Sequence, residues 1–128
     1  RRWEVSQGTT IEEIIKSEVS SWDGNHYWGF VPMGFYAAQL ETLYASYARE
    51  QVLVLFAEEL RADFDEAIQT VLQFIGVTPM PLTQRFSHRR SYSESPVSKD
   101  VLVYLRDVYR NHNLKLQEML GRELPWSS

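Results

Sequence analysis

A short basic segment contains the residues best suited to chemistry on an anion. Its sequence is Arg85-Phe86-Ser87-His88-Arg89-Arg90-Ser91-Tyr92. The guanidinium group of arginine is planar and presents paired N–H donors that match the oxygens of a phosphate or sulfate ester. Arginines interleaved with serine hydroxyls therefore indicate an anion-binding loop. A solvated charged loop is the competing interpretation, because motifs this short also occur by chance.

A second segment, residues 20–31, combines aromatic side chains with Gly, Asn, Asp and Ser, a composition that disfavours regular structure. His26 lies in this loop, where a binding role competes with an ordinary surface position. The histidines His26, His88 and His112 lack the spacing of metal ligands, and the sequence has no Cys, so no metal site is predicted. His112 falls on the apolar side of the last predicted helix and is expected in the core.

Composition narrows the class of protein. The net charge is −4, but residues 81–128 alone hold eight basic and five acidic residues. Overall acidity argues against a nucleic-acid partner, whereas a local basic stretch suits a small anionic ligand. No apolar run approaches the ~20 residues that span a bilayer, and the start does not resemble a signal peptide. We therefore expect no membrane association and a cytoplasmic location.

The elements that must position these segments are mostly helical. Periodicity and capping residues predict four helices. The first is capped by Thr9 or Thr10 and reaches about Val19, and the others are Pro32–Ala48, Asp63 to about Ile75, and Ser98 to Leu120. Aromatic residues of the second helix are expected in the core. Gln51–Phe56 is predicted to be a strand, because its run Val52–Phe56 is continuously apolar rather than alternating, the pattern of a strand buried on both faces of a parallel sheet. A single strand cannot form a sheet, so its neighbours are expected elsewhere.

Five short motifs occur in a fixed order along the chain. They are Gly34–Leu40, Gln51–Asp63, Val71–Val77, Tyr109–Leu116 and Gly121–Trp126. This order resembles the sulfotransferases that use 3′-phosphoadenosine 5′-phosphosulfate (PAPS), and most closely the bacterial and glycosaminoglycan branch with the heparan sulfate N- and 3-O-sulfotransferases. The resemblance covers about residues 10–126. One departure is Phe64, which stands where the family usually has Pro.

The resemblance implies roles for both polar segments. In the glycosaminoglycan branch a Lys-Ser-Lys-Gly-Arg loop, followed by an aromatic residue or His, covers the cofactor phosphates. Ser87, Arg90 and Tyr92 match that loop, while His88 replaces its second Lys and Arg89 its Gly. These five residues are the implied cofactor-binding set. The implied acceptor-side residues are His26, Tyr27 and Trp28.

The resemblance also implies the fold and the activity. The fold is α/β, the C-terminal half of a P-loop-type three-layer sulfotransferase domain, mostly helical with one buried parallel strand at about 51–56. Residues 1–128 would form the C-terminal portion of one domain, whose N-terminal phosphate-loop half is a missing partner. The activity would be sulfuryl transfer from PAPS to a hydroxyl or amine of a small-molecule or carbohydrate acceptor. No residue is assigned as catalytic, so the segment alone is expected to be inactive. A non-enzymatic helical interaction module and an anion- or nucleotide-binding domain without turnover are the alternatives.

Overall fold

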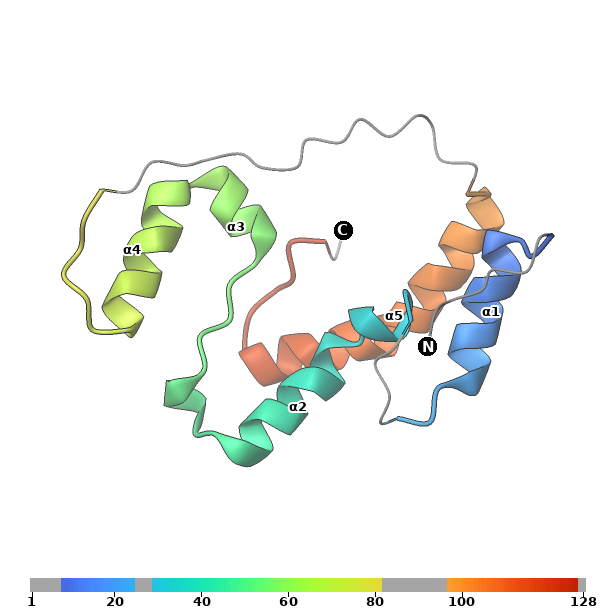
Figure 1. The fold of residues 1–128 in the computed structure, drawn as a ribbon, viewed down its shortest axis with the longest axis horizontal. Helices are drawn as coiled ribbons and strands as arrows, with labels where there is room; N and C mark the ends of the chain where they lie inside the picture. Colours follow the sequence, from blue (N-terminus) through green and yellow to red (C-terminus); the bar gives the residue numbers. More distant parts are fainter. Residues whose placement is uncertain (1–7, 25–28, 82–96, 127–128) are drawn as a thin grey trace. The chain divides into compact units, whose positions relative to one another are not determined.

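The computed structural model describes residues 8–24, 29–81 and 97–126, which are mostly helical (Figure 1). The described elements are α1 (Ile11–Ser21), η1 (Pro32–Gly34), α2 (Tyr36–Ser46), η2 (Arg49–Gln51), α3 (Ala57–Ala62), α4 (Phe64–Phe74) and α5 (Lys99–Leu120). None of these helices is both long and apolar enough to cross a bilayer. The mostly helical prediction is confirmed.

The chain divides into two compact units. Unit 1 contains the described residues up to Thr42 together with residues 97–124, and unit 2 contains those from Leu43 to residue 81 with Pro125 and Trp126. Unit 1 therefore holds α1, η1, the first part of α2 and α5. Unit 2 holds the end of α2, η2, α3 and α4.

Helix ends follow the predicted capping residues. The Thr10 hydroxyl of α1 accepts from the Glu13 amide at 3.2 Å, and the Glu13 carboxylate accepts from the Thr10 amide at 2.8 Å, which completes a capping box. Asp63 caps α4 and Ser98 caps α5 through their side-chain oxygens. After α5 the backbone of Gly121 turns left-handed, with φ of 65°.

The predicted second helix is shorter than expected and begins differently. Its first turn is the 3-10 turn η1, and Phe35, with φ −80° and ψ 62°, separates η1 from α2. The Phe35 side chain is 1% exposed, so its burial in the core accompanies this break in the helix. The expectation that the aromatic residues of this helix are core is wrong for Tyr36 and Tyr47, which are 51% and 54% exposed.

The predicted strand at 51–56 is not confirmed. Gln51 ends η2, while Val52 and Phe56 have extended backbone dihedral angles. The described part of the chain nevertheless contains no β-strand. A strand is defined by the hydrogen-bonded ladder it forms with a neighbour. The segment is thus extended and half-buried up to Phe56, without a ladder among the described residues.

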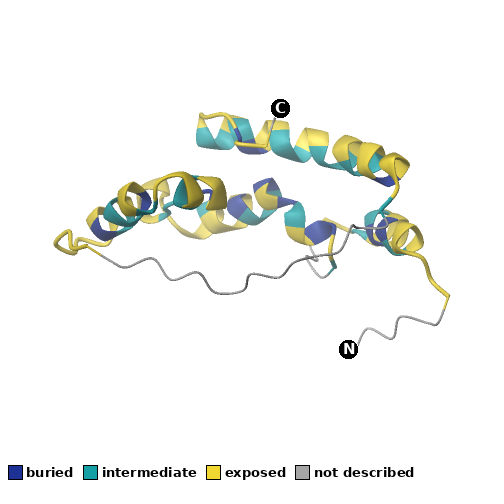
Figure 2. Ribbon diagram, turned by 90° about the horizontal axis from the view of Figure 1, so that it is seen from above, coloured by how far each residue is buried: buried dark blue, intermediate teal, exposed yellow. Residues whose placement is uncertain are grey.

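The core of unit 1 joins α1, the turn at residues 31–35 and α5. Its buried centre is Ile15, Val31, Phe35 and Val101. Partly buried residues of α1 and α5 pack around this centre, among them Val19, Trp22, Tyr104, Leu105, Val108 and Tyr109. Figure 2 shows buried and intermediate positions recurring between exposed ones along these helices. This core fixes α1 and the turn at residues 31–35, which flank residues 25–28, and α5, which follows residues 82–96.

Unit 2 has a smaller core. Ala67 and Leu72 of α4 are buried, as is Phe56, whose ring meets Trp126 edge-on at a centroid distance of 5.3 Å. α3 and α4 are separated only by Asp63, which ends one helix and caps the next. Unit 2 thus holds the extended segment in place through Phe56.

Candidate functional site

The predicted site residues lie outside the described residues. This is true of the cofactor set Ser87, His88, Arg89, Arg90 and Tyr92, and of the acceptor set His26, Tyr27 and Trp28. Their assignments therefore stay predictions. The structure does describe the residues that border both segments. Residues 24, 29 and 97 belong to unit 1, and residue 81 belongs to unit 2.

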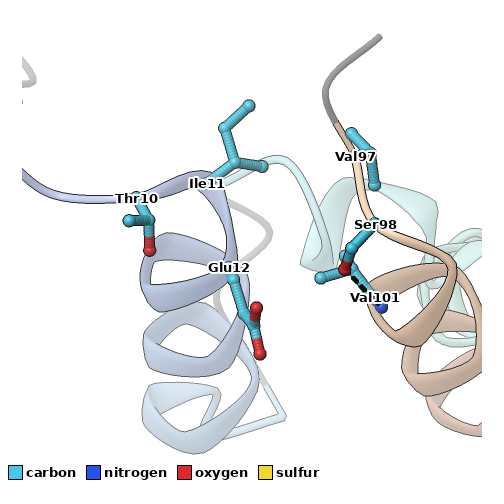
Figure 3. Close-up of a pocket in the computed structure, with 6 residues that line it drawn as sticks. All are labelled: Thr10, Ile11, Glu12, Val97, Ser98 and Val101. Carbon is cyan, nitrogen blue, oxygen red and sulfur yellow. Dashed lines mark hydrogen bonds between the residues drawn. The ribbon is translucent and has the colours of Figure 1, made fainter.

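A pocket lies at the start of α5, the first described helix after the basic segment. The pocket has a volume of about 280 Å³ and is lined by Thr10, Ile11, Glu12, Val97, Ser98 and Val101. Figure 3 shows the first turn of α1 facing the first turn of α5 across it. Val97 is the first described residue after the basic segment, so the pocket follows that segment closely in sequence.

The electrostatics of this pocket are mixed. Two helix N-termini contribute positive partial charge, which favours an anion. However, Ser98 already accepts from the Val101 amide at 3.3 Å, and Thr10 is occupied in its capping box. The Glu12 carboxylate, paired with Lys16 at 2.7 Å, also lines the pocket. The described lining alone does not favour an anion, so binding of one there would depend on added positive charge.

A buried carboxylate borders the second polar segment, and sequence reasoning missed it. Glu18 is 6% exposed, and its Oε2 accepts from the Val31 amide at 2.9 Å. The available signal was its position: Glu18 follows Ile11 and Ile15 at helical spacing and therefore faces the core. A charged residue on an apolar helix stripe is rarely buried without a partner.

Tyr109 of α5 binds the carbonyl oxygen of the same residue, Val31. Its hydroxyl donates to the Val31 carbonyl oxygen at 2.9 Å. Burial raises the pKa of the Tyr109 phenol, with smaller contributions from Tyr36 and Glu18. The phenol therefore stays protonated and able to donate at neutral pH.

His112 lies in an aromatic cluster, which confirms its predicted place in the core. Its ring stacks on Phe35 at a centroid distance of 3.9 Å and meets Trp22 edge-on at 5.4 Å. Burial lowers the pKa of the His112 imidazole, and the nearby positive charge of Lys115 lowers it further. The neutral imidazole is therefore the form that packs here.

Comparison with known proteins places the chain in a family. The model of the sulfotransferase domain matches residues 6–108, so the chain belongs to the sulfotransferase domain family. This confirms the predicted resemblance.

The similar relatives include two kinds of heparan sulfate enzyme. Human bifunctional heparan sulfate N-deacetylase/N-sulfotransferase 2 is 26% identical over 113 residues, covering 70% of this chain and 13% of that protein. Mouse heparan sulfate glucosamine 3-O-sulfotransferase 3B1 is 23% identical over 122 residues, covering 77% of this chain and 31% of that protein. The chain thus spans less than a third of either relative. No solved structure gives a significant match.

Proposed function

We propose that the protein containing this chain transfers a sulfuryl group from PAPS to a hydroxyl or amine of a carbohydrate acceptor. The observation that supports this most is the family match over residues 6–108, together with relatives named for heparan sulfate sulfation. In the reaction the acceptor oxygen or nitrogen forms a bond to sulfur as the sulfur–oxygen bond to the cofactor phosphate breaks. The products are the sulfated acceptor, adenosine 3′,5′-bisphosphate and a proton taken by a base.

The basic segment is proposed to bind the cofactor phosphates. Ser87, His88, Arg89, Arg90 and Tyr92 form the proposed set, with the arginines giving charge-assisted hydrogen bonds. Their proximity in sequence to the N-terminus of α5 supports this, because helix N-termini favour anions. Arg89 and Arg90 would also supply the positive charge that the described pocket lining lacks.

The acceptor is proposed to contact His26, Tyr27 and Trp28. Aromatic faces with a polar tip suit sugar rings, which present both C–H surfaces and hydroxyls. The general base and the phosphate loop are proposed to come from an N-terminal half of the same domain. The extended residues 52–55 would then be one strand of the shared sheet. A cytoplasmic location stays a prediction.

Binding of adenosine 3′,5′-bisphosphate tests this function in the full-length protein. We expect wild type to bind, and Arg90→Ala to weaken binding about tenfold to a hundredfold, since a hydrogen bond to a charged group contributes ~1.5–3 kcal/mol. Isothermal titration calorimetry measures both affinities. Arg106→Ala, which removes an exposed arginine of α5, is the matched control and should bind like wild type. Equal affinity of the Arg90→Ala and wild-type proteins would remove the loop from the site.

A further inference from the structure

The backbone of Val31 is held on both sides by side chains distant in sequence. Glu18 of α1 accepts from its N–H at 2.9 Å, and Tyr109 of α5 donates to its carbonyl oxygen at 2.9 Å. Val31 is itself buried at 2% exposure. A turn that two helices secure through two successive peptide groups has little freedom to shift.

Two glycines let these side chains approach the turn. A Cβ on Gly29 would lie 2.8 Å from the Glu18 Cδ, and Gly29 also has a φ of 131°, which disfavours any other residue. A Cβ on Gly34 would lie 2.7 Å from the Tyr109 hydroxyl oxygen. The close approach of Glu18 therefore depends on glycine at position 29, and that of Tyr109 depends on glycine at position 34.

Holding the turn with the Glu18 carboxylate carries a desolvation cost. Its second oxygen, Oε1, is buried, and no group among the described residues hydrogen-bonds it. Burying a carboxylate oxygen without a partner is strongly unfavourable, and an apolar residue would stabilise the core more simply. The buried carboxylate is therefore better explained by a need to hold residues 29–31 in one geometry than by a contribution to stability.

We propose that Glu18 and Tyr109 are positioning residues for acceptor binding. By holding the backbone N–H and C=O of Val31 they fix the turn that immediately follows His26, Tyr27 and Trp28 in the chain. This inference rests on the proposed function, in which those residues contact the acceptor. Neither Glu18 nor Tyr109 needs to touch the acceptor or the cofactor, because each acts through the backbone of the turn.

The test separates acceptor affinity from cofactor affinity in the full-length protein. Glu18→Ala should weaken binding of a heparan sulfate oligosaccharide about tenfold to a hundredfold, from the loss of one hydrogen bond to a charged group that holds the turn. Tyr109→Phe should weaken it about twofold to tenfold, from the loss of a neutral one. Glu18→Gln should restore binding to within about threefold, because the amide oxygen still accepts. Affinity for adenosine 3′,5′-bisphosphate should not change.

A second measurement tests directly whether Glu18 restricts opening of the turn. Hydrogen exchange of the Val31 amide should be faster in Glu18→Ala than in wild type and in Glu118→Ala, which removes an exposed carboxylate of α5. Unchanged exchange in Glu18→Ala would overturn the proposal, as would faster exchange with unchanged oligosaccharide affinity. Equal loss of both affinities would also overturn it and show general unfolding. If the wild-type protein bound no bisphosphate, the proposed function would be wrong. The hydrogen-exchange result would still decide whether Glu18 holds the turn.

Discussion

Single residues of unit 1 show how a helical core accommodates polar chemistry. Glu18, Tyr109 and His112 lie on the core side of α1 and α5, among aliphatic and aromatic neighbours. Glu18 and Tyr109 hydrogen-bond the backbone N–H and C=O of Val31, whereas the His112 ring stacks on Phe35. These three side chains meet specific partners, but Oε1 of Glu18 and Nε1 of Trp22 have no hydrogen-bond partner among the described residues.

His112 should make stability depend on pH. Its pKa is lowered in the folded protein, so the unfolded state binds more protons near pH 6. Stability should be complete above the ordinary histidine pKa of about 6.5 and should decrease as pH falls through the lower folded value. Urea unfolding at a series of pH values measures this. The His112→Phe protein should show a smaller decrease than wild type between neutral and mildly acidic pH, and identical pH profiles would contradict the assignment.

Among the elements, the starts of three helices are set by local sequence, whereas the state of the extended segment depends on a partner strand. α1, α4 and α5 begin at capping residues that bond amides three residues ahead. The extended residues 52–55, by contrast, need a partner strand to become a strand.

The cap of α5 should contribute measurably to stability. Ser98→Ala removes the side-chain acceptor for the Val101 amide and should lower the free energy of unfolding by about 1 kcal/mol. Ser98→Asp keeps an acceptor and adds a favourable charge at the helix N-terminus, so it should restore the stability. Chemical denaturation measures all three proteins. A Ser98→Ala protein as stable as wild type would mean that water replaces the cap.

The extended segment should behave as a strand buried on both faces in the full-length protein. Leu53 and Val54 would then point to opposite faces of a sheet, since side chains alternate along a strand. Leu53→Ser and Val54→Ser should each lower the free energy of unfolding, by roughly 2 kcal/mol or more, because each places a hydroxyl in an apolar layer and leaves a cavity. Denaturant titration compares them. Tolerance of either substitution would indicate an exposed face and overturn the two-sided burial.

For the whole molecule, the activity proposed from the family match needs more catalytic roles than the residues of this chain have been assigned. Sulfuryl transfer needs phosphate contacts at both ends of the cofactor, a base for the acceptor and positive charge at the bridging oxygen. The proposed residues account for part of the phosphate contacts and for acceptor binding. The remaining roles are proposed to belong to the N-terminal half of the domain.

The 128-residue segment alone should therefore not catalyse transfer. Loss of a general base alone typically lowers a rate ~10²–10⁴-fold, and loss of positioning adds to that. The purified segment and the full-length protein should be assayed in parallel with labelled PAPS and a panel of hydroxyl and amine acceptors. Turnover by the segment comparable to that of the full-length protein would show that its own residues include the catalytic base.

Features that depend on near neighbours could be predicted from the sequence. The caps Asp63 and Ser98, a threonine cap at the start of α1 and the end of the last helix before Gly121 each depend on groups a few residues apart. The order of the family motifs could also be recognised in the sequence. The anion-binding and acceptor segments also came from sequence, and they remain predictions.

The partners of the buried polar residues, by contrast, are set by tertiary packing. The Glu18–Val31 hydrogen bond joins residues 13 apart, and the Tyr109–Val31 hydrogen bond joins residues 78 apart. The break at Phe35 and the exposure of Tyr36 likewise depend on how α1 and α5 pack around the turn at residues 31–35. Helical periodicity identifies the side of a helix that faces the core, but it contains no information about the partner that a buried group meets there. That partner is fixed by long-range packing, which is why the helical spacing of Glu18 indicates a core-facing position but not its hydrogen bond to Val31.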